Sequence, residues 1–202
     1  MEVILTDNQT KLRAIAEQAD GVIRTADAQA AGISRTMLSK LEREGFIERV
    51  ARGQYILAEA LPDELYLWQY RRKDLVYSHE TAMYLLDMAE RVPFQHSATL
   101  PNNKRLSSVF PGDFKLYYVK PELHGLGVVA LPTKCGHEVN VYNAERTICD
   151  VLRSRRRIDD QTIAAAIKNY AVRQKKDFTA LGEMARAFRV TAQLQTYLEV
   201  LL

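Results

Sequence analysis

The stretch Gly32-Ile33-Ser34-Arg35-Thr36-Met37-Leu38-Ser39-Lys40-Leu41-Glu42-Arg43 decides the fold of the N-terminal region. Ser34 belongs to the residue types that cap helix N-termini, so it predicts a helix over about residues 35–44. Apolar residues recur here at helical spacing, and we expect them to face inward: Ile33, Met37, Leu38 and Leu41. The outward face is then basic and hydroxyl-bearing, with Arg35, Thr36, Ser39, Lys40 and Arg43.

Two helices are expected before this stretch, and a hairpin after it. Thr6 and Gln9 have the spacing of a capping box and predict a helix over about residues 7–20. Thr25 is expected to cap an alanine-rich helix over residues 26–31, with a short turn containing glycine before the next helix. Residues 46–57 form two β-rich segments around Gly53, which indicates a hairpin. Three helices followed by a hairpin predict a winged helix-turn-helix.

The outward face of residues 35–44 has the chemistry that DNA recognition requires. An N-terminal arginine of a recognition helix can read guanine through two hydrogen bonds, and short hydroxyl side chains suit phosphates or base edges. Further cations on the helix and on the hairpin would neutralise phosphates. The predicted DNA-binding residues are Ser34, Arg35, Thr36, Ser39, Lys40, Arg43, Arg49 and Arg52. The alternative is a unit that only mediates protein contact, its charges being a solvated face.

Composition alone does not indicate a nucleic-acid binder. The 202 residues carry a formal net charge of +3, and residues 1–57 contain eight Lys/Arg and eight Asp/Glu. The hydrophobic fraction of 47% and charged fraction of 26% are those of a folded globular protein. We find no apolar run long enough to span a membrane and no secretion signal. With only Cys135 and Cys149, no disulfide scaffold is expected, and a cytoplasmic location is predicted.

The remaining residues predict a second domain, over residues 58–202, beside a DNA-binding domain over residues 1–57. Helices are expected from Pro62, with Leu65 and Trp68 inward, and over residues 79–89, capped by Ser78. Strands are expected at residues 114–119, 128–131 and 138–142, in a small antiparallel or mixed sheet. Later helices are expected to start after Asn143, at Asp159, at Asp177 and at residue 191. The predicted class is α+β: a winged helix-turn-helix followed by a mixed α/β module that ends in a helical bundle.

Two motifs in this second region are similar to those of a known family. They are Val76-Tyr77-Ser78-His79-Glu80-Thr81-Ala82-Met83-Tyr84-Leu85-Leu86 and Glu145-Arg146-Thr147-Ile148-Cys149-Asp150-Val151-Leu152. With the winged unit before them and strands between them, the chain resembles the AbiEi antitoxins. These are the autorepressors of bacterial type IV toxin–antitoxin and phage abortive-infection systems.

The resemblance implies functions that spacing alone does not indicate. Such proteins bind inverted repeats of double-stranded DNA in their own promoter through the N-terminal domain and repress the operon. The C-terminal domain is implicated in countering the cognate AbiEii toxin, a nucleotidyltransferase-like protein, without a stable complex being a general feature. The resemblance thus implies an antitoxin and autorepressor, not an enzyme, that dimerises in solution or on DNA. An alternative is a protein-binding antitoxin whose winged unit is vestigial.

Enzyme and metal chemistry find little support in the sequence. Cys135-Gly136-His137 and Cys149 lack the paired spacing of zinc ligands, so no metal or cofactor is predicted. No feature pairs a cysteine with His79, His96, His124 or His137 for nucleophilic catalysis. Asp150, with Asp159 and Asp160, is the one alternative, as metal ligands of a nucleic-acid enzyme. We favour the simpler interpretation, in which Asp150 orients Arg146 or a helix end and the other two carboxylates begin a helix.

The densest basic cluster of the chain is Arg153, Arg155, Arg156 and Arg157. Two functional interpretations remain open: a second nucleic-acid contact, or a site for an acidic surface of the toxin. The Lys175-Lys176 pair extends the same face in either interpretation. A third interpretation is a solvated helix end, whose cations complement the helix dipole.

Overall fold

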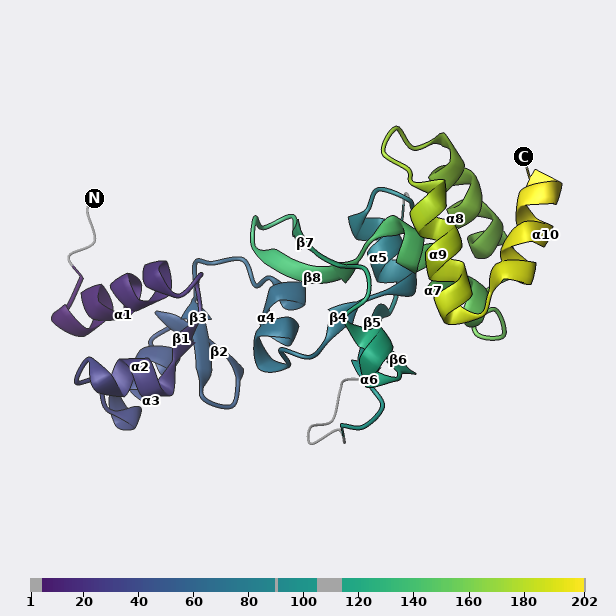
Figure 1. Ribbon diagram of the computed structural model, residues 1–202. Coiled ribbons are helices and arrows are strands. Elements are labelled where there is room, and N and C mark those ends of the chain that lie inside the picture. The colour runs from purple at the N-terminus through teal and green to yellow at the C-terminus, as the bar shows by residue number, and fades with distance from the viewer. Residues whose placement is uncertain (1–4, 90, 105–113, 202) are drawn as a thin grey trace. The chain divides into compact units, whose positions relative to one another are not determined.

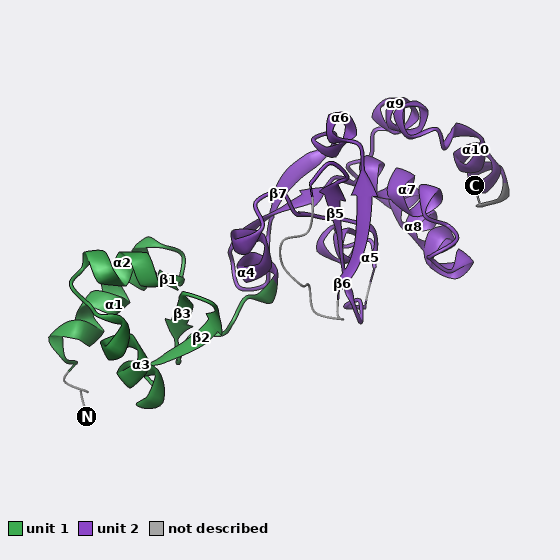
Figure 2. Ribbon diagram, turned by 90° about the horizontal axis from the view of Figure 1, so that it is seen from below, with its two compact units in different colours: residues 1–64 green, residues 65–202 purple. Residues whose placement is uncertain are grey.

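A computed structural model of the chain describes residues 5–89, 91–104 and 114–201 (Figure 1). The chain divides into two units, residues 1–64 and residues 65–202 (Figure 2). No helix in the described ranges is long and apolar enough to cross a membrane.

The described part of unit 1 consists of three helices and a small antiparallel sheet. The helices are α1 (Asp7–Gln18), α2 (Thr25–Ala30) and α3 (Arg35–Arg43). The strands are β1 (Ile23–Arg24), β2 (Ile47–Ala51) and β3 (Gln54–Leu57), in the order β1-β3-β2. Two helices joined by a short turn and followed by a hairpin form the predicted winged helix-turn-helix.

Local sequence explains where these elements begin and turn. The Thr6 capping box is present, and the Ser34 hydroxyl accepts the backbone N–H of Met37 at 3.1 Å. Gly32, between α2 and α3, and Gly53, at the hairpin tip, both have positive φ angles, which glycine adopts without strain. The prediction for Thr25 is wrong by one residue: Thr25 is the first helical residue, and Arg24 precedes it without a side-chain cap.

The core of unit 1 lies between the helices and the sheet. Its buried residues come from every element of the unit: Leu12, Ala16, Ile23, Ala28, Ile33, Leu38, Leu41, Ile47 and Tyr55. The positions predicted to face inward on α3 are among them, except Met37, which is half-buried. β1 lies beside β3, with Ile23 opposite Tyr55. The link before α2 is therefore part of the sheet and fixes α2 against the wing.

In the described residues of unit 2, a five-stranded mixed sheet has the order β6-β5-β4-β8-β7. The strands are β4 (Val76–Tyr77), β5 (His96–Pro101), β6 (Phe114–Val119), β7 (Val128–Pro132) and β8 (Glu138–Tyr142). β5 pairs with β6 and β4 with β8 in parallel, whereas β4–β5 and β7–β8 are antiparallel. The predicted strands at residues 114–119 and 138–142 have the observed bounds.

Short elements of unit 2 depart from the sequence predictions. Helix α4 (Glu64–Arg71) begins after Pro62, and its buried residues are Leu67 and Gln69, while Leu65 and Trp68 are half-buried. Helix α5 (His79–Leu85) ends four residues before residue 89, and Asp87 beyond it has a φ of +56°. Strands β4 and β5 and the one-turn helix α6 (Pro121–His124) were not predicted.

Four helices complete unit 2: α7 (Ala144–Arg153), α8 (Asp160–Val172), α9 (Phe178–Phe188) and α10 (Thr191–Leu201). Asn143, Asp159 and Asp177 cap the first three, as predicted. Residues 144–152 of α7 are all buried, because α7 lies between the sheet and the other helices (Figure 1). This burial places the second sequence motif at the centre of the unit.

Candidate nucleic-acid interface

The exposed face of α3 carries five of the eight residues predicted to bind DNA. Leu38 and Leu41 anchor the helix in the core of unit 1. All eight predicted residues are exposed: Ser34, Arg35, Thr36, Ser39, Lys40, Arg43, Arg49 and Arg52. The first six residues of α3 therefore offer a guanidinium, two hydroxyls and an ammonium group to solvent.

Intramolecular contacts leave most of these cations available. Arg35 has no ion pair among the described residues, and Lys40 has a long one, 3.7 Å from Nζ to the Glu44 carboxylate. Arg43 Nε donates to the carbonyl of Ser39 at 3.2 Å. The Ser34 oxygen caps α3, but its hydroxyl hydrogen is not needed for the cap. Surface pairs of this kind contribute about 0–1 kcal/mol, so a phosphate can replace them.

The hairpin β2–β3 forms the wing and carries the other two arginines. Arg49 lies opposite Tyr55 in the ladder, and its Nε donates to the carbonyl of Ala51 at 3.3 Å. A register shift between Arg49 and Ala51 bulges β2 next to the tip. Arg52 is exposed at the tip, beside Gly53. Both guanidinium groups are therefore exposed on the wing, where cations can contact a phosphate backbone.

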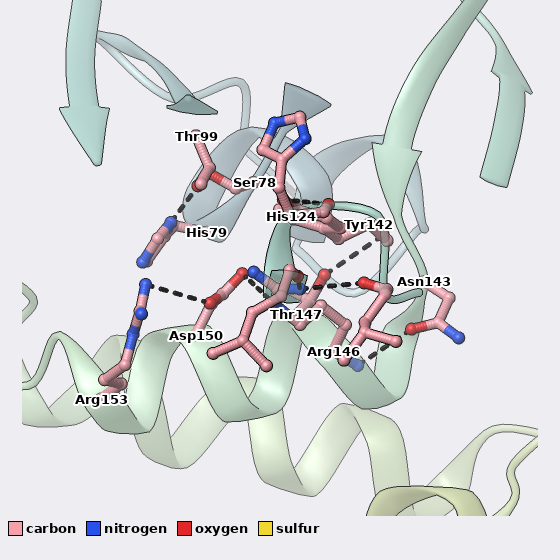
Figure 3. Close-up of polar contacts among 12 residues, drawn as sticks. Ser78, His79, Thr99, His124, Tyr142, Asn143, Arg146, Thr147, Asp150 and Arg153 are labelled. Carbon is pink, nitrogen blue, oxygen red and sulfur yellow. Dashed lines mark hydrogen bonds and ion pairs between the residues drawn. The ribbon is translucent and has the colours of Figure 1, made fainter. Parts of the chain in front are cut away.

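Unit 2 has a second group of polar residues, at its buried centre (Figure 3). Arg146 is fully buried and donates from Nε to Asp150 at 3.0 Å and from Nη1 to the carbonyls of Leu123 and Leu126 at 2.8 and 2.9 Å. Its guanidinium lies 3.8 Å from the Tyr142 ring centre and 3.9 Å from that of Phe188. Arg146 thus ties α7 to α6, the turn after it, β8 and α9.

Asp150 orients Arg146, as the simpler interpretation of the sequence predicted. Its carboxylate is fully buried, and Arg153 Nη2 lies 3.5 Å from the second oxygen. Burial raises the pKa of the Asp150 carboxyl, and the guanidinium groups of Arg146 and Arg153 oppose that rise. The Asp150 carboxylate therefore forms a structural ion pair with Arg146. Asp159 and Asp160 instead begin α8, the former accepting the N–H of Thr162 at 2.8 Å.

His79 is one of several buried residues of the first motif. Its ring stacks on Tyr117 with the ring centres 3.4 Å apart, and its nitrogens contact the hydroxyls of Ser78 and Ser154, each at 2.9 Å. Thr99 donates to the same Ser78 oxygen at 2.9 Å. Burial lowers the pKa of His79 well below its usual range, and the nearby cations Arg153, Arg146, Arg157 and Lys115 lower it further. The imidazole is therefore neutral at physiological pH.

The other motif residues join α5 to the sheet. Glu80 forms an ion pair with Lys115 at 2.8 Å and accepts the Ser97 hydroxyl at 2.9 Å. Thr81 accepts the backbone N–H of Ser97 at 2.7 Å. The Tyr-Ser-His-Glu-Thr sequence thus positions α5 against β5 and β6, a role that the spacing of the motif did not reveal.

The two cysteines differ in exposure and in their surroundings. Cys149 is buried, and burial raises the pKa of its thiol to about 12, so it remains protonated. Cys135 is exposed, and the nearby His137 ring stacks on Tyr66 with the ring centres 4.5 Å apart. Within the described ranges, no three His, Cys, Asp or Glu residues are grouped as metal ligands.

The basic cluster lies at the end of α7 and just beyond it. Arg153 is the last residue of the helix, and Arg155, Arg156 and Arg157 are exposed in the turn before α8. Arg157 lies over the Tyr117 ring at 4.2 Å and donates to the carbonyl of Leu116 at 3.1 Å. The structure therefore brings this cluster next to β6. Lys176, in the α8–α9 loop, donates to the carbonyl of Ala171 at 2.6 Å.

Most of unit 1 is similar to a known protein family. Residues 11–58 match the protein-family model described as "Transcriptional regulator, AbiEi antitoxin". Unit 1 matches the AbiEi family. The matched stretch contains all of the predicted DNA-binding residues and lies outside the two motifs from which the resemblance was inferred. It therefore supports that resemblance from a separate part of the chain.

The chain also has a structural relative over nearly its full length. The crystal structure of the RV2827C protein from Mycobacterium tuberculosis matches with a TM-score of 0.58 and 13% sequence identity. The match covers 98% of this chain and 83% of that one, which confirms the α+β fold. None of the curated proteins matches the sequence.

Proposed function

We propose that the chain is a DNA-binding antitoxin of the AbiEi type that represses its own operon. Two copies bind an inverted repeat, each placing α3 in the major groove and the wing on the adjacent phosphates. For half-sites one helical turn apart, the two recognition helices lie about 34 Å from each other. Unit 2 counters a nucleotidyltransferase-like toxin.

The observation that carries this proposal is the exposed face of α3. Arg35 stands at the N-terminal end of the helix, where winged helix-turn-helix proteins contact bases, and has no ion pair among the described residues. Lys40 and Arg43 on α3, and Arg49 and Arg52 on the wing, are further exposed cations. Occupation of the operator by this face would block transcription without any catalytic step.

The antitoxin part of the proposal rests on the AbiEi match in unit 1 and on the two motifs in unit 2. The motif residues are largely buried and hold the unit together, so they do not themselves provide a contact surface. We therefore assign the action against the toxin to the surface of unit 2 and not to the motifs.

The direct test measures binding of the full chain to its own upstream DNA at fixed salt. We expect Arg35→Ala/Lys40→Ala to weaken binding by tenfold or more, because one base contact contributes about 1–3 kcal/mol. The dependence on salt should also decrease by about one phosphate contact. Fluorescence anisotropy with a labelled promoter fragment gives both values.

A matched control removes equal charge from another helix of unit 1. Lys11→Ala/Arg13→Ala changes two exposed or half-exposed cations of α1, whose partners are Asp7 and Glu59. Its affinity should remain within about threefold of that of the unaltered protein. If the α3 variant binds as tightly as the control, the winged unit does not read DNA, and a purely protein-binding antitoxin is supported.

A further inference from the structure

We propose that unit 2 binds a short single-stranded nucleic acid in two adjoining basic pockets at the end of α7. This site is separate from the α3 face and does not depend on promoter binding. It gives the Arg153–Arg157 cluster a specific ligand class, and it uses residues that neither sequence motif includes.

The two pockets share part of their walls. The first has a volume of about 400 Å³ and is lined by Tyr117, Tyr118 and residues 153–157. The second has a volume of about 360 Å³, and its lining includes Lys120, Glu122, Phe188 and Arg189. Tyr118 and Arg153 belong to both linings, so the pockets are neighbours. Each volume lies within the range of about 300–1,000 Å³ that small-molecule sites occupy.

The pockets are strongly cationic. Their linings hold Lys120, Arg153, Arg155, Arg156, Arg157 and Arg189, against the single carboxylate of Glu122. Arg155 and Arg156 are exposed and make no ion pair within the part of the chain that the structure describes. Arg155 and Arg156 follow the C-cap Ser154 and so lie beyond the last turn of α7. Free guanidinium groups around a pocket are suited to phosphate oxygens.

Two of the arginines are held in place before any ligand arrives. Arg157 lies over the Tyr117 ring and donates to the carbonyl of Leu116. Arg153 is 3.5 Å from Asp150 and 5.6 Å from the centre of the Phe188 ring. Fixed guanidinium groups lose less conformational freedom on binding than mobile ones. The site therefore combines two positioned cations with two free ones.

The aromatic wall favours single strands over duplexes. Tyr118 is 45% exposed on β6 and lines both pockets, so its ring is available to a stacked base. Single-strand sites combine a basic groove with exposed aromatic rings, because unpaired bases offer their faces. A duplex hides those faces and cannot place a nucleotide in either pocket. An acidic protein surface would use the arginines but would not require the tyrosine.

The experiment uses the full chain carrying Arg35→Ala/Lys40→Ala, which weakens duplex binding by the α3 face. Labelled eight-nucleotide single strands of DNA and of RNA, and a hairpin duplex of the same sequence, are titrated by fluorescence anisotropy. We expect the single strands to bind more tightly than the duplex. Arg155→Ala/Arg156→Ala should reduce the salt slope by about 1.4, the value for two phosphate contacts on a single strand.

Tyr118→Ala separates stacking from charge. It should weaken binding of the single strand by about fivefold or more while leaving the salt slope unchanged, because stacking contributes about 1–3 kcal/mol per base. The matched charge control is Lys134→Ala/Lys168→Ala, two exposed cations outside both linings. Unfolding midpoints verify that every variant is folded.

Three results would overturn the proposal. One is equal loss of binding in the Lys134/Lys168 control and in the Arg155/Arg156 variant, which would indicate non-specific attraction. Another is unaltered binding by the Tyr118 variant. The third is displacement of the strand by a polyglutamate peptide at lower concentration than by unlabelled strand, which would favour an acidic protein partner. Failure of promoter binding by the α3 face would affect none of these measurements.

Discussion

At the scale of single residues, Arg146 holds several elements of unit 2 together. Its three side-chain hydrogen bonds reach Asp150 in its own helix and two carbonyls outside it, and two aromatic rings cover its faces. Both partners of the Arg146–Asp150 pair are fully buried. Removing one partner leaves a charge inside the protein without compensation, which costs far more than losing a surface pair.

We predict that Arg146→Ala lowers the free energy of unfolding by about 3–5 kcal/mol. Urea denaturation followed by circular dichroism measures this change. The control is Arg186→Ala, an exposed arginine of α9, which should alter stability by less than about 0.5 kcal/mol. The double variant Arg146→Leu/Asp150→Leu should regain part of the loss. Equal stability of the Arg146 and Arg186 variants would contradict the assigned role.

His79 predicts how stability depends on pH. Its pKa is well below 6.5 in the folded state, so only the unfolded chain binds the proton between pH 6.5 and the folded pKa. Stability is therefore complete above about pH 6.5 and falls as the pH decreases below it, by up to about 1.4 kcal/mol per unit. His79→Asn should lose this dependence between pH 5.5 and 7, because asparagine does not titrate. Asparagine also tolerates the positive φ of 48° at this position. Parallel slopes in both proteins would refute the assignment.

The sequence predicted part of this buried centre. The interpretation in which Asp150 orients Arg146 or a helix end agrees with the hydrogen bond between these two residues. The sequence did not reveal that Thr99 contacts Ser78, because these residues lie 21 positions apart and are brought together by the pairing of β4 with β5. Tyr117 was recognised only as part of a strand, although it stacks on His79.

At the scale of elements, the turn before β7 fixes the start of α7. Gly127 has a φ of +77°, and its carbonyl accepts the N–H of Asn143 at 2.7 Å. A Cβ at this position would lie 2.8 Å from the Arg146 Cβ and 2.9 Å from the Asn143 side-chain oxygen. The turn can therefore hold only glycine without moving the helix cap.

We predict that Gly127→Ala destabilises the protein by about 1–2 kcal/mol more than Gly136→Ala does. Gly136 has a similar φ of +89°, but no atom lies within 4 Å of the place that an added Cβ would take, so its variant reports backbone strain alone. Thermal or urea unfolding of both variants measures the difference. Equal losses would mean that the contact with Arg146 and Asn143 adds nothing.

The N-cap of α3 makes a related prediction. Ser34→Ala should cost about 1 kcal/mol of stability, because the N–H of Met37 loses its acceptor. Ser39→Ala, on the exposed face of the same helix, should cost less than about 0.5 kcal/mol. Urea titrations compare the two, and a larger loss for Ser39 would contradict the capping assignment.

Helices and strands that depend on local sequence signals were predicted correctly. Caps and apolar periodicity located α1, α3, α7, α8 and α9, and β-rich segments located β6 and β8. β4 has only two residues and exists because β5 and β8 lie on either side of it, a tertiary cause without a local pattern. α5 stops at Leu85 for a similar reason, since Met88 turns into the core of unit 2.

At the scale of the whole molecule, the two functions that we propose are assigned to different units. Unit 1 holds the predicted DNA contacts and the AbiEi match, while unit 2 holds its own core and sheet. The similarity in fold to a solved structure covers 98% of the chain and so includes both units. We therefore expect substitutions on α3 to change repression without changing the action against the toxin.

The separation is testable in cells that express the cognate toxin. The full chain with Arg35→Ala/Lys40→Ala, supplied from an unrelated promoter, should restore growth as well as the unaltered protein does. A reporter under the native promoter should at the same time become derepressed. Loss of growth rescue at equal protein level would show that the toxin is countered through the winged unit.

The proposed function depends most on α3 entering a DNA groove while the wing contacts the neighbouring backbone. Hydroxyl-radical footprinting of the chain on its own upstream region, at low ionic strength, tests this directly. We predict two protected half-sites about one helical turn apart, with protection lost in the Arg35→Ala/Lys40→Ala variant. An upstream region that shows no protection at any protein concentration would contradict the proposed function.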